Sequence, residues 1–246
     1  MPLESLKHFK IIVSQQYYKD YKMLFNWLLS HEIQRKSLLK KVPDGALKDF
    51  LSVPFPDKAT LVNELTILSV DFETTGLNAI NDKLLSVGFV EVVNQQIKLN
   101  TSYHQIINTE KELEASNVII HKITDKQKSQ GKPLKMVVEK LLQALAGKVM
   151  LVHFARIEKQ FLKQACLKLY GFYPPLLIID TLALAKKKLD QRDIAYDSSE
   201  LTLSSLRQKS GLPEHLAHNA LNDAIATAEL FLAQDKHNNL TLKALC

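Results

Sequence analysis

The stretch Asp71-Phe72-Glu73-Thr74-Thr75-Gly76 decides the fold expected of this chain. It follows the short apolar run 65–70, which is typical of a buried central strand. Side chains two residues apart on a strand share a face, so Asp71 and Glu73 project together from its carboxyl end. Such close carboxylates repel each other, and a divalent cation with oxygen ligands removes that conflict. The stretch therefore predicts a cation site or, more simply, two exposed acids at a strand end.

The turn that leaves this strand is the second feature of the stretch. Thr74, Thr75 and Gly76 form a tight turn whose backbone amides could face an anionic ligand. Both features place candidate site residues at the same end of the expected strand.

Composition is that of an ordinary globular protein. Of 246 residues, 46% are hydrophobic and 24% charged, and the net charge is +6 with a pI near 9.1. Basic residues in excess favour a polyanionic partner. Cys166 and Cys246 are far apart in the sequence, which argues against a disulfide framework or a zinc motif. Without a signal-peptide core or a membrane-length apolar run, we expect a soluble, cytoplasmic protein with no membrane partner.

Residues 1–62 differ from the rest of the chain. Apolar residues recur there at helical spacing with basic residues between them, and Pro54 and Pro56 mark a break before the first strand. We expect two or three amphipathic helices that form an N-terminal helical extension. The extension either packs on the main domain or contributes to nucleic-acid binding or dimerisation.

Residues 63–246 alternate between strand and helix patterns. A hairpin is expected from 84–93 and 97–107, with a polar turn around Asn94. Two further apolar strands, 148–154 and 176–179, are each followed by a helical pattern. A meander followed by strand–helix units indicates an α/β fold with a mixed sheet. The expected helices are 110–145, interrupted at 121–124, then 155–170, 182–189, 201–210 and 219–234.

Glu158 is the second acidic candidate. It lies in the first turn of the helix after a buried strand, and ligands of open α/β sheets gather outside the carboxyl ends of strands. An acid at this position also stabilises the helix dipole without any function. Both interpretations are open for Glu158 by itself.

His218 and Asp223 form the third candidate group. Five residues along an ideal helix turn about 500°, which leaves the two side chains roughly 140° apart. They can meet at one site only if His218 sits on the loop before the helix. The simpler interpretation is a capping histidine and an aspartate that complements the helix dipole.

In this order, Asp71, Glu73, Glu158, His218 and Asp223 resemble the DnaQ-like exonucleases of the DEDDh branch. The resemblance covers residues 66–233. It includes the motifs Asp71–Leu77 and His218–Ala224, the stretch 121–124 beginning at His121, and the pair Asp180-Thr181. The chain departs from the family at two positions: Glu158 stands where Asp is usual, and Phe154 where Asn is usual.

The resemblance implies an RNase H-like sheet of about five strands flanked by helices, and a metal-dependent 3′–5′ exonuclease. Two Mg²⁺ or Mn²⁺ ions would bind the scissile phosphate, with Asp71, Glu73 and Asp223 on one ion and Asp71 and Glu158 on the other. His218 would deprotonate the attacking water. Nucleoside 5′-monophosphates would leave the 3′ end. The residues expected to contact substrate are Phe72, Thr74, Thr75, Gly76, Leu77, His121 and Phe154.

The expected partner is the 3′ end of a nucleic acid, with DNA favoured and a polymerase as a possible further partner. An RNA-trimming enzyme of the oligoribonuclease type, or a catalytically weakened binding module, is the alternative. The sequence does not determine the oligomeric state, or a preference for single or double strands.

Overall fold

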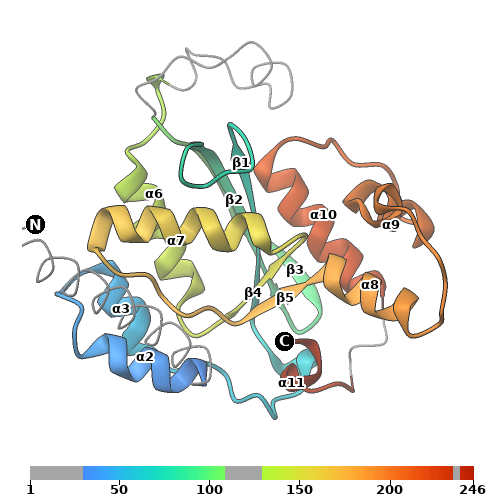
Figure 1. The fold of residues 1–246 in the computed structure, drawn as a ribbon, viewed down its shortest axis with the longest axis horizontal. Coiled ribbons are helices and arrows are strands. Elements are labelled where there is room, and N and C mark those ends of the chain that lie inside the picture. Colours follow the sequence, from blue (N-terminus) through green and yellow to red (C-terminus); the bar gives the residue numbers. More distant parts are fainter. Residues whose placement is uncertain (1–29, 109–128, 235–238) are drawn as a thin grey trace, which may run out of the picture.

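A five-stranded sheet lies at the centre of the computed structural model, which describes residues 30–108, 129–234 and 239–246 (Figure 1). The strand order is β3-β2-β1-β4-β5. β1 pairs antiparallel with β2 and parallel with β4, so the sheet is mixed, as predicted. The strands are β1 (Ile67–Thr74), β2 (Leu84–Val93), β3 (Gln96–Ile106), β4 (Val149–Val152) and β5 (Ile178–Asp180).

Parallel pairing places three strand ends at one edge of the sheet. β1, β4 and β5 run in the same direction, with Ser69 paired to Leu151 and Val152 paired to Asp180. The segments that follow these strands therefore emerge side by side. The candidate site segments at the ends of these three strands therefore meet at this edge, which is where ligands bind in α/β sheets.

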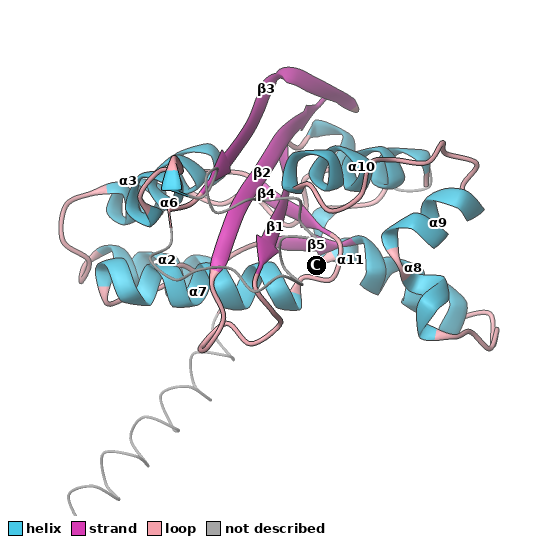
Figure 2. Cartoon of the chain, turned by 90° about the horizontal axis from the view of Figure 1, so that it is seen from above, coloured by secondary structure: helices cyan, strands magenta, loops and turns pink. Residues whose placement is uncertain are grey.

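Helices cover both faces of the sheet (Figure 2). On one face, α3, α6 and α7 pack over Leu68, Val70 and Phe72 of β1. On the other face, α10 and α11 pack over Ile67 of β1 and the neighbouring strands. The helices are α2 (His31–Leu39), α3 (Ala46–Ser52), α6 (Leu134–Leu145), α7 (Arg156–Tyr170), α8 (Thr181–Asp190), α9 (Leu203–Lys209), α10 (Ala220–Ala233) and α11 (Leu242–Leu245), with short 3-10 turns η1 (Val62–Glu64) and η2 (Ser198–Leu201).

The helices α2 and α3 share the core of the main domain. Leu47, Phe50 and Leu51 of α3 are at most 2% exposed and belong to the same buried cluster as the apolar face of α6. The buried Arg35 of α2 donates hydrogen bonds to Glu32 and to the backbone carbonyl of Leu51, which joins α2 to α3. These two helices therefore pack on the domain. The division of the chain at residue 62 stays a prediction.

Gly88 fixes the position of α10 on the sheet. Gly88 is the β2 partner of Asp71, and a Cβ atom on it would lie 2.1 Å from the carbonyl carbon of Ala220 and 2.2 Å from the amide nitrogen of Leu221. Only glycine allows the first turn of α10 to approach β2 so closely. The hydroxyl of Ser69 donates to the carbonyl of Ala224 at 2.7 Å and binds the next turn to β1. Together these contacts hold the start of α10 over Asp71.

The observed elements agree with the expected ones to within a few residues. The hairpin turns at Asn94 and Gln95, which both have positive φ, and the strands expected at 148–154 and 176–179 are shorter in the structure. The part of the expected helix 110–145 before residue 129, and His121 with it, falls outside the described residues. Within the described segments, no helix has the length and apolar character needed to span a bilayer.

Candidate active site

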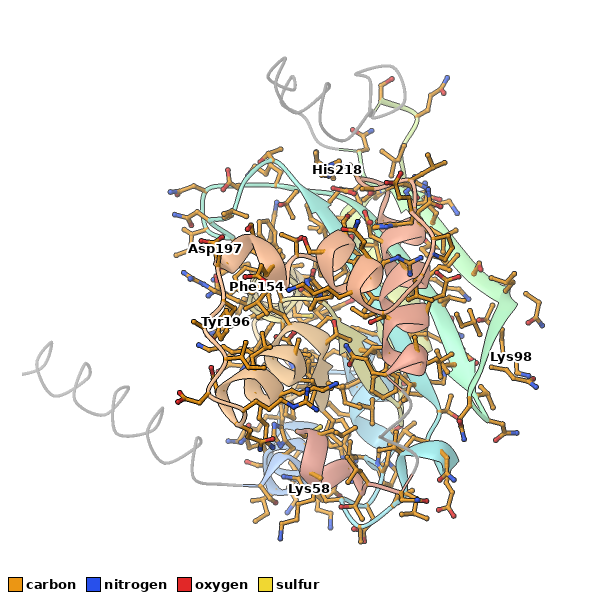
Figure 3. All side chains as sticks on the ribbon, turned by 90° about the vertical axis from the view of Figure 1, so that its right-hand side faces the viewer. Lys58, Lys98, Phe154, Tyr196, Asp197 and His218 are labelled. Atoms are coloured by element: carbon orange, nitrogen blue, oxygen red, sulfur yellow. The ribbon has the colours of Figure 1, made fainter. Side chains whose placement is uncertain are left out.

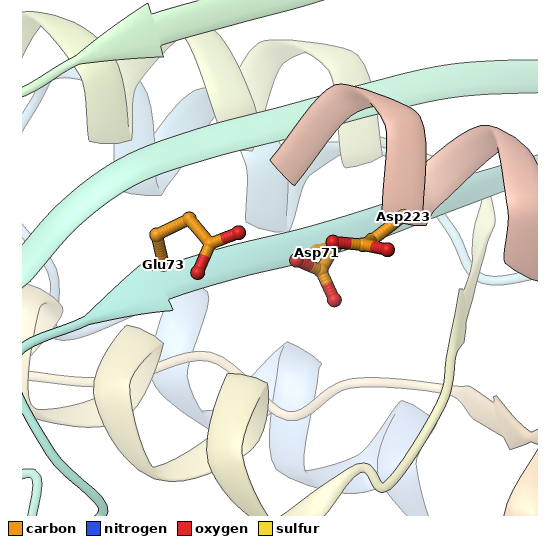
Figure 4. Close-up of side chains that lie close together, drawn as sticks. All are labelled: Asp71, Glu73 and Asp223. Carbon is orange, nitrogen blue, oxygen red and sulfur yellow. The ribbon is translucent and has the colours of Figure 1, made fainter. Parts of the chain in front are cut away.

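Three carboxylates meet at the carboxyl end of β1. Asp71 and Glu73 extend from β1, and Asp223 comes from the first turn of α10 (Figure 4). One oxygen from each lies within 4.8 Å of the others, a spacing suited to a shared metal ion. Alternation along β1 directs Asp71 and Glu73 toward α10, and the close contact at Gly88 brings Asp223 above them. The structure therefore brings together three of the four predicted metal ligands.

The cluster is electrostatically costly without a cation. Burial raises the pKa of Asp71 well above its ordinary value, and the negative charges of Glu158, Asp223 and Glu73 raise it further. Burial, with Glu73 as the next cause, also raises the pKa of Asp223. Because a divalent cation favours the ionised form of each group, its binding would reverse these shifts. The donor set of three carboxylates thus fits a hard divalent cation.

Glu158 lies at the start of α7 and is only 3% exposed. Burial raises its pKa to about 8, and Asp180 adds to the shift. One carboxylate oxygen, Oε2, is buried and has no hydrogen-bond partner. An acid that only complemented the helix dipole would gain from remaining solvated, so burial with an unsatisfied oxygen favours a ligand role. Its charge raises the pKa of Asp71, which places Glu158 beside the cluster rather than within it.

Two hydrogen bonds fix the orientation of Asp223. His215 Nε2 lies 2.8 Å from Asp223 Oδ1, and the amide of Asn219 donates to Oδ2 at 3.2 Å. The side chain of Asn219 also accepts from the amides of Leu221 and Asn222, as an N-cap does. His215 was not among the site residues expected from the sequence. Its only signal was a second histidine three residues before His218, and spacing by itself did not connect it to Asp223.

His218 sits on the loop that leads into α10. It precedes the N-cap Asn219, has φ of +64°, and its side chain is exposed. This is the loop position that the sequence analysis required if His218 and Asp223 were to serve one site. A residue with positive φ turns the chain sharply there, so the helical separation of about 140° does not apply.

The turn after β1 is held by its own polar groups. Thr74 Oγ1 donates to the carbonyl of Gly76 at 2.7 Å, and the amide of Thr75 donates to Lys83 O at 2.9 Å. The carboxylate of Asp82 approaches Gly76 so closely that a Cβ there would lie 2.5 Å from it. The expectation that the amides of this turn face an anion is therefore wrong for Thr75, because its N–H is already bonded inside the loop.

Phe72 and Leu77 have opposite environments. Phe72 is 6% exposed and belongs to the core beneath α7, because alternation directs it away from Asp71 and Glu73. Its side chain therefore points away from the carboxylates, and a contact of Phe72 with substrate stays a prediction. Leu77 is 73% exposed in the loop beyond β1 and is available to a ligand.

Phe154 occupies an unusual backbone conformation between β4 and α7. Its φ is +72°, and its ring is 40% exposed. Asp180 holds this segment, since Oδ1 accepts from the amide of Phe154 at 3.0 Å and Oδ2 from that of Ala155 at 2.9 Å. The same carboxylate caps α8. Phe154 and His218 lie on the face shown in Figure 3.

The RNase_T family, described as Exonuclease, matches residues 68–231, which is most of the chain and includes every described candidate acid and His218. The chain belongs to this exonuclease family. The resemblance to DnaQ-like exonucleases found in the sequence is thereby confirmed.

Curated relatives of this exonuclease family are much longer proteins. A PolC-type DNA polymerase III from Thermotoga petrophila is 32% identical over 167 residues, which are 68% of this chain and 12% of the polymerase. A 3′-5′ exonuclease DinG from Staphylococcus aureus is 30% identical over 182 residues, 73% of this chain and 19% of that protein. The chain thus spans less than a fifth of the length of these relatives.

Solved exonucleases share the fold. The zinc-bound E. coli exonuclease I in complex with single-stranded DNA superposes with a TM-score of 0.60 at 16% identity, covering 73% of this chain and 42% of that one. At this identity the likeness concerns the fold. The prediction of an RNase H-like mixed sheet flanked by helices is confirmed.

Proposed function

We propose that this protein is a metal-dependent 3′–5′ exonuclease that releases nucleoside 5′-monophosphates from the 3′ end of DNA. The observation that carries the proposal is the buried carboxylate cluster of Asp71, Glu73 and Asp223 in an exonuclease-family domain. A charged cluster that costs free energy to bury is retained most readily where it binds a cation.

Two divalent cations, Mg²⁺ or Mn²⁺, are the proposed cofactors. Asp71, Glu73 and Asp223 would hold one ion, and Asp71 with Glu158 the other. The unpartnered Glu158 Oε2 and its position beside Asp71 support the second assignment. When bound, the cations would offset the charge that develops on the scissile phosphate and on the leaving 3′-oxygen.

His218 is the proposed general base. An imidazole nitrogen can accept a proton from the attacking water, which is the task of a general base. Its side chain is exposed on the loop before α10, the helix that carries Asp223. His215 and the amide of Asn219 hold Asp223 in a fixed orientation meanwhile.

The substrate end would lie over the carboxyl edge of the sheet. Leu77 and Phe154 present exposed apolar surface there, and both are proposed to contact nucleotides. Thr74, Thr75 and Gly76 contribute by shaping the loop that carries Leu77. His121 remains a proposed contact outside the described residues.

DNA is favoured over RNA because PolC-type polymerase and DinG proteins are among the relatives and exonuclease I is bound to DNA. These relatives also support a role in replication or repair and a possible polymerase partner. An RNA-trimming exonuclease would use the same cluster and is the second candidate. A cytoplasmic location stays a prediction.

The test is hydrolysis of 5′-labelled DNA and RNA oligomers by purified protein with Mg²⁺, with Mn²⁺ and in excess EDTA. We expect a ladder of products shortened one nucleotide at a time from the 3′ end, abolished by EDTA and by Asp71→Asn. Asp49→Asn, an exposed aspartate on α3 outside the cluster, is the matched control. Cleavage that persists in EDTA, or in Asp71→Asn, would refute the proposal.

A further inference from the structure

Phe154 is an exposed ring on a strained backbone. Among the phenylalanines of the described residues, Phe154 has the most exposed side chain, with 40% of its surface accessible. Its φ of +72° lies in the left-handed region, which bulky side chains seldom adopt. Glycine or asparagine would occupy this conformation with less strain. Since the ring is only partly buried, its packing stabilises the fold too little to offset that strain.

The neighbouring groups impose this conformation on Phe154. Asp180 accepts hydrogen bonds from the amides of Phe154 and Ala155 with its two oxygens. Nδ1 of the preceding residue, His153, lies 2.8 Å from Thr181 Oγ1, and its Nε2 lies 3.0 Å from the carbonyl oxygen of Leu201. The segment is therefore held on both sides of Phe154. Strain that the surroundings enforce in this way is typical of functional positions.

The ring also lies at the edge where the carboxylates gather. Ser69 of β1 pairs with Leu151 of the parallel strand β4, and Asp71 and Phe154 lie two and three residues beyond this pair, respectively. Phe154 stands four residues before Glu158, just ahead of the start of α7, and the charge of Glu158 acts on Asp71. A nucleotide whose phosphate reached the carboxylates would thus bring its base, or the next one, within range of this ring.

We propose that Phe154 is a stacking platform for an unpaired base near the 3′ end of the substrate. The inference rests on the proposed exonuclease function and specifies its substrate class. Every base has a π-face, so an aromatic ring binds single strands with little sequence preference. Bases inside a duplex have both faces covered by their neighbours. Single-stranded 3′ ends are therefore the substrate that this platform selects.

The test measures each protein variant on each of several substrate oligomers. KM and kcat are measured for wild type and Phe154→Leu on a single-stranded DNA oligomer, and on matched oligomers with one abasic site at each of the last three positions. Leucine keeps the apolar bulk and removes the aromatic face. We expect Phe154→Leu to raise KM about 5- to 100-fold on the intact oligomer, the range that base–aromatic stacking supplies. When the abasic site lies at the position that stacks on Phe154, wild type and Phe154→Leu should have similar KM values. The protein change and the substrate change then remove the same contact.

Two further variants separate stacking from structure. Phe154→Asn should raise the melting temperature, because strain is relieved, and yet raise KM as Phe154→Leu does. Phe154→Tyr should retain the KM of wild type. Tyr173→Leu is the matched control, an exposed aromatic of similar accessibility beyond the other end of α7, where Lys163 lies over its ring.

The outcomes distinguish the two proposals. Suppose that wild type degrades the oligomers with Mg²⁺ but Phe154→Leu leaves KM unchanged. The platform is then refuted and the exonuclease function stands. The same conclusion follows if Phe154→Leu raises KM as much on all three abasic oligomers as on the intact one. If wild type neither binds nor degrades any oligomer, both are refuted.

Discussion

His215 Nε2 lies 2.8 Å from Asp223 Oδ1 and, with the amide of Asn219 on Oδ2, engages both oxygens of that carboxylate. Both partners come from the segment that leads into α10. Groups that orient a metal ligand from behind commonly change metal affinity as much as activity. His215 is thus a positioning residue for Asp223, although it stands eight residues away in the sequence.

Replacing His215 should loosen Asp223. For His215→Ala, we expect the Mg²⁺ concentration at half-maximal activity to rise about 10- to 100-fold, because Asp223 loses its fixed orientation. A Mg²⁺ titration of the initial rate measures this shift. His31→Ala, a half-buried histidine at the start of α2, is the control and should leave the titration unchanged. Superimposable titrations of wild type and His215→Ala would contradict the positioning role.

Gly88 should be intolerant of even one methyl group. In Gly88→Ala, the new Cβ would lie within 2.3 Å of three backbone atoms of Ala220 and Leu221, so α10 must move and take Asp223 with it. We expect a loss of about 1–3 kcal/mol in the free energy of unfolding and a larger loss of activity. Denaturant unfolding and rate measurements test both. Ser86→Ala, on the same face of β2 with an unpaired buried hydroxyl, is the control and should cost little stability.

His218 is expected to act on the rate rather than on binding. His218→Ala should lower kcat by about 10²–10⁴-fold, since a positioned base contributes about that factor. The acidic limb of the pH–rate profile should also disappear from the residual activity. The measurement is the profile of kcat between pH 5.5 and 9 at saturating Mg²⁺. A profile that keeps its shape would assign the base to another group.

Glu158 should make the metal-free protein less stable as the pH rises. Burial raises its pKa to about 8 from 4.5, so between these values the folded state holds a proton that the unfolded state has released. The free energy of unfolding must therefore decrease as pH increases through this window. His31, His104 and His153, whose pKa values are lowered by burial, act in the opposite direction, but only at lower pH.

The comparison of wild type with Glu158→Gln in EDTA isolates this effect. These histidines are present in both proteins and cancel in the comparison, so between pH 6.5 and 8 the melting temperature of wild type should fall more steeply than that of Glu158→Gln. Saturating Mg²⁺ should reduce the difference, because the cation stabilises the ionised carboxylate. Equal slopes for the two proteins in EDTA would mean that Glu158 is ionised in the folded state.

Removing α3 should unfold the domain rather than only weaken nucleic-acid binding. Leu51 is fully buried in the cluster that includes the face of α6. We expect Leu51→Ala to cost about 2–5 kcal/mol of stability and deletion of residues 1–62 to cost more. Circular dichroism melts measure both. A truncated chain 63–246 that melts cooperatively at the wild-type temperature would instead support a domain boundary at residue 62.

The sequence alone determined the strand that ends in Asp71 and Glu73, the hairpin after it, and the order of the acids. These follow from local rules, because alternation along one strand and turn residues such as Asn94 act within a few positions. The same alternation directs the side chain of Phe72 into the core.

Only the tertiary structure decided which distant groups meet. It placed His215 against Asp223, the backbone of Ala220 against Gly88, and the two oxygens of Asp180 on the loop of Phe154. Each of these contacts joins different elements or loops, and its geometry depends on how helices seat on the sheet. The left-handed conformation of Phe154 has the same origin, because a carboxylate 26 residues later in the chain holds its amide. Local propensity carries no information about such pairings, since they arise from the packing of the whole domain.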